Sequence, residues 1–307
     1  MLWKGKNKFN HIEVAPGGQA IGFGTYNTLG RTYFVNNITG ASTNDGRTWD
    51  RAVAQPQQAI DLAATYLATH ATNNNWIRNT IVIQGTETAY EKITACPNAC
   101  DMIGLGTVMG IGSWGSVARI ASATDVLVGD TRGMGLFNLR FESYGGTGYY
   151  IFKIPNSLGM QMEDCSLMSH ADNDTTRLSA AIGGTSVVWA GHVIRNCRIG
   201  GAGGTYGCEI GIQLDNASAT WNNCLIENNI IEAHSYGIRG KAVANAQGTM
   251  IRGNDIFGQT DDRTGAVLSV GIQMSLYAHA HFNRISAADG FKDNETYQVV
   301  GNTIVTS

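Results

Sequence analysis

The fold is decided by two short stretches of the sequence, IENNII at residues 226–231 and IRGNDI at residues 251–256. Each has an isoleucine three positions before a central asparagine, Asn229 or Asn254, and another isoleucine two positions after it. The two centres are 254 − 229 = 25 residues apart. A spacing of this size indicates a structure built from stacked repeats.

The same pattern returns seven times between residue 136 and the end of the sequence. The central residues are Leu139, Cys165, Cys197, Asn229, Asn254, Asn283 and Asn302. Their spacing ranges from 302 − 283 = 19 to 197 − 165 = 32 residues. The apolar residues before the centres are Leu136, Met162, Ile194, Ile226, Ile251, Ala280 and Val299, and those after them are Phe141, Leu167, Ile199, Ile231, Ile256, Ile285 and Ile304. A second motif, Gly-Ile, interleaves with the first at Gly211, Gly237 and Gly271, and Ala181-Ile182 is a degenerate earlier copy.

The repeat predicts an all-β protein, a right-handed parallel β-helix. One unit carries strands too short to bury their own apolar side chains, but stacked units pair each strand with its counterpart and bury the side chains in columns. Asn or Gly at or just before most of the centres suits a bend, because both residues tolerate the left-handed backbone conformation. We expect the stacked asparagines to hydrogen-bond along their column. A β-sandwich is the alternative, but it would show longer alternation and more hairpin turns.

Before the regular repeat, the chain predicts a cap for the β-helix. Tyr33 to Val35 reads as a strand, and Pro56 opens a helix with an apolar stripe, which suits a short N-terminal capping helix. Residues 80–83 read as a buried strand. We therefore predict an extended arm over residues 1–31 and one β-helix domain over 32–307. Its cap covers about 32–71 and its coils about 80–305.

Composition excludes several function classes. Charged residues make up 15% of the chain, hydrophobic residues 43%, and the net charge is 21 − 24 = −3. No basic run is present, so no nucleic acid is expected as a partner. No apolar stretch is long enough for a membrane span. The opening MLWKGKNKFNHIEV has no apolar core, so no classical secretory signal is expected.

Several segments resemble the pectate-lyase-like superfamily of single-stranded right-handed β-helices. The opening resembles theirs through Tyr33-Phe-Val, the loop Asp45-Gly46-x-x-Trp49 and the helix Ala59-Ile60-Asp61-x-Ala63. The stretches at 81–83, 90–93 and 103–106 resemble their first coils. The resemblance covers about residues 32–305 and implies the fold. Because the superfamily contains polysaccharide lyases, glycoside hydrolases, epimerases, adhesins and viral spikes, it does not imply one activity.

The resemblance implies a groove along an outward sheet face. Since Ile212, Ile238 and Ile272 are expected to point inward, Gln213, Arg239 and Gln273 are predicted to form an outward polar column that could bind sugar hydroxyls. A solvated polar face is the alternative. For a glycoside hydrolase, the candidates are the carboxylate pair Asp261 and Asp262. For a lyase, Arg239 or Arg252 could serve as the base.

The sequence offers little for a metal or cofactor. Asp172 and Asp174 could hold calcium in a loop, but we predict neither a cofactor nor a metal site. Cys165, Cys197 and Cys224 are expected to be buried thiols at ladder positions. Cys96 and Cys100 could form a local disulfide.

Two functions compete. The favoured one is a structural or adhesive protein of a bacteriophage particle, such as a capsid decoration, vertex appendage or tailspike, which could bind surface glycans. Its expected partners are other virion proteins, identical subunits in a homotrimer, and polysaccharide. The last coil, without an obvious cap, supports a partner. The alternative is a polysaccharide lyase or glycoside hydrolase, located outside the cell. The sequence leaves catalysis open and favours a role without it.

Overall fold

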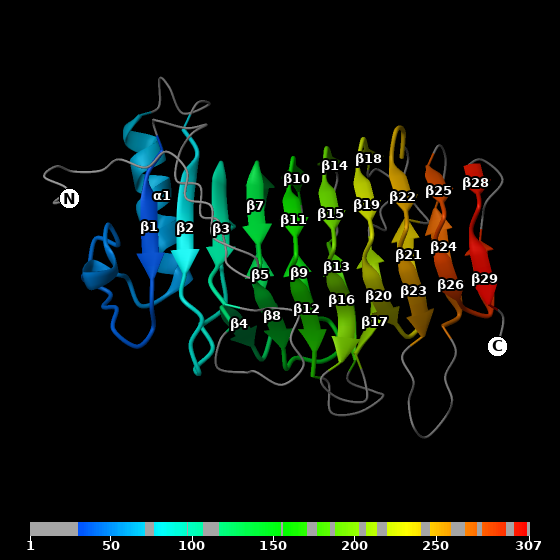
Figure 1. Cartoon of the computed structure of the whole chain (residues 1–307), viewed down its shortest axis with the longest axis horizontal. Coiled ribbons are helices and arrows are strands. Elements are labelled where there is room, and N and C mark those ends of the chain that lie inside the picture. The colour runs from blue at the N-terminus through cyan, green and yellow to red at the C-terminus, as the bar shows by residue number, and fades with distance from the viewer. Residues whose placement is uncertain are drawn as a thin grey trace, which may run out of the picture.

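A computed structural model describes residues 30–70, 77–96, 98–106, 117–154, 156–170, 177–184, 188–202, 207–213, 220–240, 246–258, 268–274, 278–292 and 298–305. The chain is a right-handed parallel β-helix, as the repeat predicts. Its strands lie side by side in sequence order along the long axis of the molecule (Figure 1). The N-terminal arm predicted for residues 1–31 lies almost wholly outside the described residues.

Four parallel sheets run along the molecule, here called A to D. Sheet A contains β1 (Thr32–Val35), β2 (Asn79–Ile83), β3 (Cys100–Gly104), β7 (Met134–Phe137), β11 (Gln161–Glu163), β15 (Val193–Arg195), β19 (Leu225–Glu227), β22 (Met250–Arg252), β25 (His279–His281) and β28 (Gln298–Val300). Sheet B contains β4 (Arg119–Ser122), β8 (Arg140–Ser143), β12 (Ser166–Ser169), β16 (Arg198–Ala202), β20 (Ile230–Ala233), β23 (Asp255–Gly258), β26 (Arg284–Ser286) and β29 (Thr303–Val305).

The other two sheets complete each coil. Sheet C contains β5 (Leu127–Val128), β9 (Tyr150–Lys153), β13 (Leu178–Gly183), β17 (Cys208–Gln213), β21 (Tyr236–Gly240), β24 (Val270–Met274) and β27 (Asp289–Lys292). Sheet D contains the short strands β6 (Thr131–Arg132), β10 (Ser157–Leu158), β14 (Val188–Ala190) and β18 (Thr220–Asn222). The chain therefore passes from A to B to C, and in the middle coils through D, before it returns to A one coil further on.

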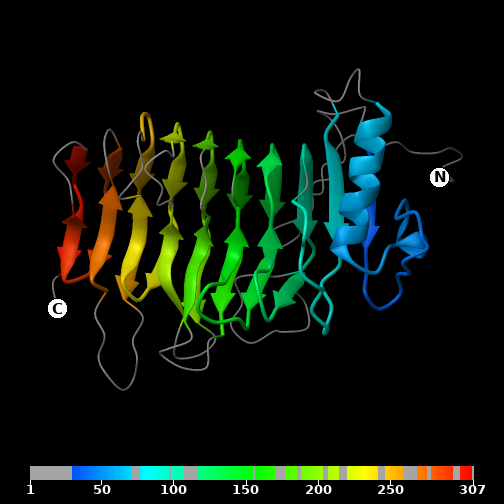
Figure 2. The same cartoon turned by 180° about the vertical axis from the view of Figure 1, so that it is seen from behind.

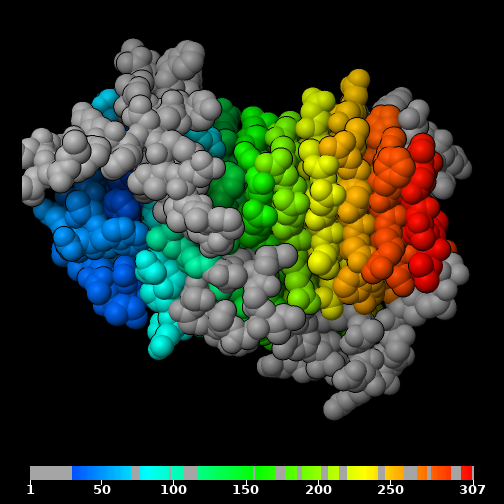
Figure 3. Space-filling view, in the orientation of Figure 1, coloured from blue at the N-terminus to red at the C-terminus, as the bar shows by residue number. Residues whose placement is uncertain are grey.

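The strand registers confirm the apolar columns predicted from the repeat. In sheet A, Ile226 lies opposite Ile194 on one side and Ile251 on the other. In sheet B, Ile231 lies between Ile199 and Ile256 in the same way. Figure 3 shows the coils crossing the surface as adjacent bands. Residues at equivalent positions of neighbouring coils therefore lie about 4.8 Å apart.

The corner between sheets A and B has a left-handed residue directly before most of the motif centres. Asn138, Asn196 and Asn228 have φ of 52°, 54° and 54° there, and Gly253 has φ of 65°. This conformation bends the chain between two short strands, and asparagine and glycine adopt it at low cost. The bend predicted at this position is confirmed.

The N-terminal end is closed by α1 (Pro56–Thr69), preceded by a 3₁₀ turn, η1 (Trp49–Arg51). Figure 2 shows α1 packed beside β1 and β2. Sheets B and C begin only with β4 and β5, so β1 and β2 have no other sheet to cover their inward side chains. Ala59, Ile60 and Ala63 fill this place and belong to the same buried cluster as Tyr33 and Ile81.

Candidate functional site

Five side chains meet where sheet B turns toward sheet C, and we call them the corner cluster: Arg119, Arg140, Glu142, Tyr144 and His170. Phe141 points into the core, so alternation puts Arg140 and Glu142 on the outer face of β8. Arg119 comes from β4, where its register partner is Arg140. His170 follows β12, and its backbone N–H donates to the carbonyl of Ser143 at the end of β8. Side chains from three consecutive coils thus lie together at this corner.

Glu142 is the centre of the corner cluster and is fully buried. Tyr144 Oη donates a hydrogen bond to its Oε2 over 2.9 Å, and Arg140 Nε lies 2.5 Å from its Oε1. Arg119 Nη1 and His170 Nε2 lie 3.6 and 3.7 Å from Oε2. Burial alone would raise the pKa of this carboxyl, but these four partners outweigh it and hold the pKa below its ordinary value. Glu142 is therefore ionised at neutral pH.

Two tyrosines present aromatic surface beside this buried carboxylate. The ring of Tyr144 is stacked on that of His170, with centroids 4.6 Å apart and planes 12° apart. Tyr144 is nevertheless 50% exposed, so about half of its surface is open to solvent. Tyr149 is 38% exposed, and its ring lies against Gly145, where an added Cβ would be 3.0 Å from Tyr149 Cδ2. The rings are held by packing and by the bond from Tyr144 to Glu142.

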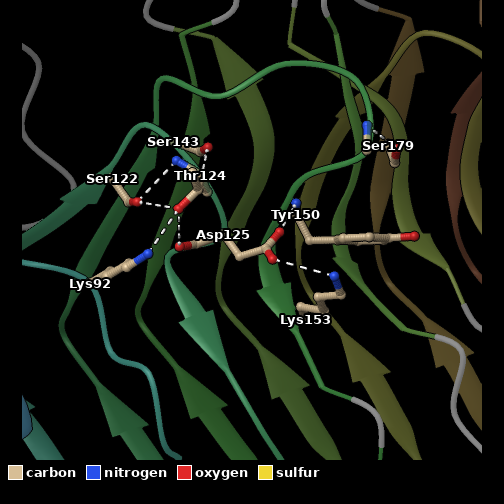
Figure 4. A network of polar contacts seen from close by, with 9 residues as sticks. Lys92, Ser122, Thr124, Asp125, Ser143, Tyr150, Lys153 and Ser179 are labelled. Carbon is tan, nitrogen blue, oxygen red and sulfur yellow. Dashed lines mark hydrogen bonds and ion pairs between the residues drawn. The ribbon is translucent and has the colours of Figure 1, made fainter.

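A network of hydroxyl groups and lysines continues from the cluster into sheet C (Figure 4). Lys92 Nζ donates to Thr124 Oγ1 over 3.3 Å, and Ser143 Oγ donates to the carbonyl of Thr124 over 3.0 Å. The next residue, Asp125, accepts a bond from the backbone N–H of Tyr150 over 2.7 Å and lies 3.5 Å from Lys153 Nζ. These bonds fix the segment between β4 and β5 against β8 and β9, so the corner is rigid.

The arrangement suits binding better than proton transfer. Burial and the neighbouring Glu142 carboxylate raise the pKa of Tyr144. At neutral pH its hydroxyl is protonated while Glu142 is ionised, which leaves neither a phenolate nucleophile nor a carboxylic acid to donate a proton. The ionised Glu142 carboxylate is fully buried among its partners, so it is not presented to a ligand as a base. Two arginines against one carboxylate give the cluster a charge of 2 − 1 = +1 when His170 is neutral. Such a corner can stack against an apolar face and attract an anionic group.

The predicted polar column on sheet C has the predicted register. Gln213 lies opposite Arg239, and Arg239 lies opposite Gln273. Ile212, Ile238 and Ile272 belong to the buried core, as expected from the second motif. Gln213 and Arg239 are half-buried, and the Arg239 guanidinium lies over Tyr236, 4.6 Å from the ring centre. Gln273 is fully buried, so its side chain does not reach the surface of the column.

The other predicted site residues are dispersed or lie outside the described residues. Asp261 and Asp262 fall in 259–267, and Asp172 and Asp174 fall in 171–176, both outside the described residues. Arg239 therefore has no described relationship to the aspartate pair. In the part of the chain that the structure describes, no three His, Cys, Asp or Glu side chains are grouped to hold a metal ion. No helix among the described residues has the length and apolar character to cross a bilayer.

All six cysteines are buried and free, so Cys96 and Cys100 are not joined in a disulfide. Cys165 and Cys197 occupy the predicted ladder position at the corner between sheets A and B. Cys224 does not, because it precedes β19 at the corner between sheets D and A. Its sequence context is similar, with Asn223 before it at φ 52°. The same bend is used at two corners, and local sequence alone does not distinguish them.

The sequence-based search missed Glu142, Tyr144 and His170 as a group. A signal for two of them was present, because Arg140, Glu142 and Tyr144 alternate directly after a repeat centre and must share the outer face. His170 is brought to them by the stacking of coils. Comparison with models of known protein families and with curated proteins found no match.

Proposed function

We propose that this chain is a glycan-binding, adhesive β-helix protein of a bacteriophage particle, and that the corner cluster is its glycan contact. The observation that carries the proposal is the exposed ring of Tyr144, backed by His170 and anchored by the buried Glu142. A pyranose ring has an apolar face of C–H groups that stacks on an aromatic side chain, and polar edges that hydrogen-bond. A tyrosine that is already immobilised loses little entropy when it binds.

The surroundings of Tyr144 support a polymeric ligand. Tyr149 offers a second exposed ring, and Lys92 and Lys153 add donors on either side of Thr124 and Asp125. Successive coils repeat at about 4.8 Å, close to the length of one pyranose unit, so a glycan chain can contact equivalent positions of neighbouring coils. A stack of parallel strands provides a rigid support for such a surface.

The test is binding of the purified full chain to a panel of bacterial surface polysaccharides, measured by calorimetry. Tyr144→Ala is expected to weaken binding roughly tenfold, equivalent to about 1.4 kcal/mol. Tyr144→Phe keeps the ring and is expected to retain most of the affinity. Phe282→Ala is the matched control, because Phe282 is an exposed aromatic at a different corner. Equal binding by Tyr144→Ala and the parent would contradict the proposal, as would a parent that binds nothing in the panel.

The remaining parts of the proposal have separate tests. Association into a homotrimer or with other particle proteins is a prediction that the molar mass in solution and co-purification with particles can check. Polysaccharide cleavage is the alternative function. New reducing ends or unsaturated uronate, lost in Asp261→Asn and Asp262→Asn variants, would replace adhesion by catalysis as the main function.

A further inference from the structure

A pocket lies at the N-terminal end of the molecule, between β1, the turn before η1, and α1. Its volume is about 390 Å³, and Arg31, Tyr33, Asp45, Arg47 and Tyr66 are among the residues that line it. It is formed by the cap, whereas the corner cluster belongs to the coils of β4, β8 and β12. The glycan contact proposed above does not involve this pocket.

Two guanidinium groups converge on the pocket from different elements. Arg31, directly before β1, lies over the ring of Tyr66 of α1, with Cζ 3.9 Å from the ring centre. Arg47 lies over the ring of Tyr33, with Cζ 5.5 Å from the centre. A guanidinium that contacts a ring through its face keeps its N–H edge for a planar or tetrahedral anion.

Tyr33 connects the two arginines. Burial raises the pKa of its hydroxyl, and the nearby guanidiniums of Arg31 and Arg47 oppose this rise. The hydroxyl donates its own proton to the carbonyl of Leu62 over 3.2 Å. Both arginines therefore lie close to one buried tyrosine that lines the pocket.

The charges of the two arginines are not balanced by carboxylates. Among the residues that the structure describes, no Asp or Glu oxygen lies within 4.0 Å of the Arg31 or Arg47 guanidinium. The nearest lining acid, Asp45, is paired with Arg51 at 3.3 Å and accepts the backbone N–H of Arg47 at 3.2 Å. Arg51 and Asp45 neutralise each other, and Arg31 and Arg47 leave a local charge of +2.

The remaining lining groups favour an ionic ligand over a neutral one. The hydroxyls of Thr65 and Thr69 donate to the carbonyls of Asp61 and Tyr66, each over 2.8 Å, so they have no proton left for a ligand. Among the lining side chains, the guanidiniums of Arg31 and Arg47 are therefore the positively charged donors. Arginine pairs of this kind suit a group with several negatively charged oxygens.

We propose that this pocket binds a tetrahedral oxyanion, the phosphate or sulfate group of a free ion or of a substituted sugar, between Arg31 and Arg47. The two N–H edges take different oxygens of the anion, and Tyr66 and Leu62 contact whatever carries it. The site is independent of glycan binding at the corner cluster, and either can fail without the other.

The experiment titrates the full chain with inorganic phosphate, inorganic sulfate, glucose 6-phosphate and glucose, with calorimetry as the readout. Phosphate and glucose 6-phosphate are expected to bind with affinity that falls as salt is raised, and glucose is expected not to bind. Tighter binding of glucose 6-phosphate than of phosphate identifies a substituted sugar as the source, and equal binding identifies the free ion.

Three variants test the residues. Arg31→Ala and Arg47→Ala are each expected to weaken phosphate binding about tenfold or more, and Arg47→Lys also weakens it because it removes the forked donor. Arg284→Ala is the matched control, since Arg284 is an exposed arginine paired with Asp255 at 2.8 Å. Circular dichroism melting checks that each variant is folded. Failure of the parent to bind phosphate or sulfate saturably, or equal binding by Arg31→Ala, Arg47→Ala and the parent, overturns the proposal.

Discussion

Asn229 and Asn254 are joined side chain to side chain inside the β-helix, with Asn229 Nδ2 donating to Asn254 Oδ1 over 3.0 Å. The same oxygen accepts the backbone N–H of Asn229, and Asn254 Nδ2 donates to Asn283 Oδ1 over 2.9 Å. Both asparagines are buried. The ladder gives hydrogen-bond partners both to the buried side-chain amides and to buried backbone N–H groups. Asparagine can therefore stand at a repeat centre where other coils have an apolar residue.

Replacing Asn254 by alanine should destabilise the protein strongly. Asn254→Ala removes the oxygen that accepts both the backbone and the side-chain N–H of Asn229. It also removes one of the two donors to Asn283 Oδ1, and in this buried place the loss should cost about 3 kcal/mol. The midpoint of urea unfolding measures it. Asn302→Ala is the control, because Asn302 is only partly buried at the end of the ladder and water can replace its bonds. Equal losses in the two variants would show that the ladder is not a buried structure.

The columns themselves can be tested with one buried and one outward isoleucine. Ile251 is fully buried in the column of sheet A, whereas Ile230 on the outer face of β20 is 38% exposed. Ile251→Asp places a charge without a partner in the core and should cost several kcal/mol, roughly 3 or more. Ile230→Asp should cost less than about 1 kcal/mol. Similar melting temperatures for the two variants would mean that the inward column is assigned wrongly.

Much of the fold can be predicted from the repeat. The residues around each position determine which side chains point inward and where the chain bends. The pairing of Ile194 with Ile226 and of Ile226 with Ile251 can be predicted once the repeat centres are aligned. The corner used by Cys224 could not, since an Asn-Cys bend looks the same wherever it occurs in a coil.

The candidate site was harder to predict than the fold. Alternation places Glu142 and Tyr144 on the outer face, but alternation alone predicts solvent exposure for both. Glu142 is instead fully buried, because Arg119 and His170 come from neighbouring coils and surround it. Loops of different lengths separate these residues, so their meeting depends on register between coils. The pairing of Arg31 with Arg47 could not be predicted from the sequence either, because the two residues line one pocket only through the packing of the cap.

Phe282 occupies the bend that asparagine or glycine fills in most other coils. It has φ of 53°, and the residue is 67% exposed. A left-handed conformation costs an ordinary residue roughly 1–2 kcal/mol, and asparagine relieves part of this cost. Phe282→Asn should therefore raise the stability by about 1 kcal/mol in thermal unfolding. Phe282→Ala keeps the strained conformation and should change it little. A less stable Phe282→Asn variant would mean that the ring makes contacts that outweigh the strain.

The six thiols should be unreactive until the protein unfolds. All are buried, and burial raises the pKa of Cys96, Cys100 and Cys208, and that of Cys224 to about 12. A thiol that stays protonated is a poor nucleophile. Without reductant, a thiol reagent should label none in the native protein and six in denaturant. Four labelled thiols in denaturant would indicate that one pair is bonded.

His192 should make the stability depend on pH. Its side chain is almost fully buried before β15, where Nε2 donates to the carbonyl of Ser157 over 3.0 Å, and burial lowers its pKa to about 4. As the pH falls below the ordinary value of 6.5, the unfolded chain takes up a proton that the folded chain refuses until about pH 4. Stability should therefore fall across this window, by roughly 2 kcal/mol between pH 6.5 and pH 5.

His192→Met removes this titration with a side chain that the fold already uses, since Met160 holds the equivalent place one coil earlier and accepts the N–H of Val193. Urea midpoints at pH 8, 6.5 and 5 should separate the two proteins. Between pH 8 and 6.5 the imidazole is neutral in the folded state and protonated in at most half of the unfolded molecules, so the responses of parent and variant should differ little. Between pH 6.5 and 5 the parent should lose more stability than the variant, because only its unfolded state gains the extra proton. Parallel losses in both proteins would mean that His192 is protonated in the folded chain as readily as in the unfolded one, and that water reaches this corner of the coil.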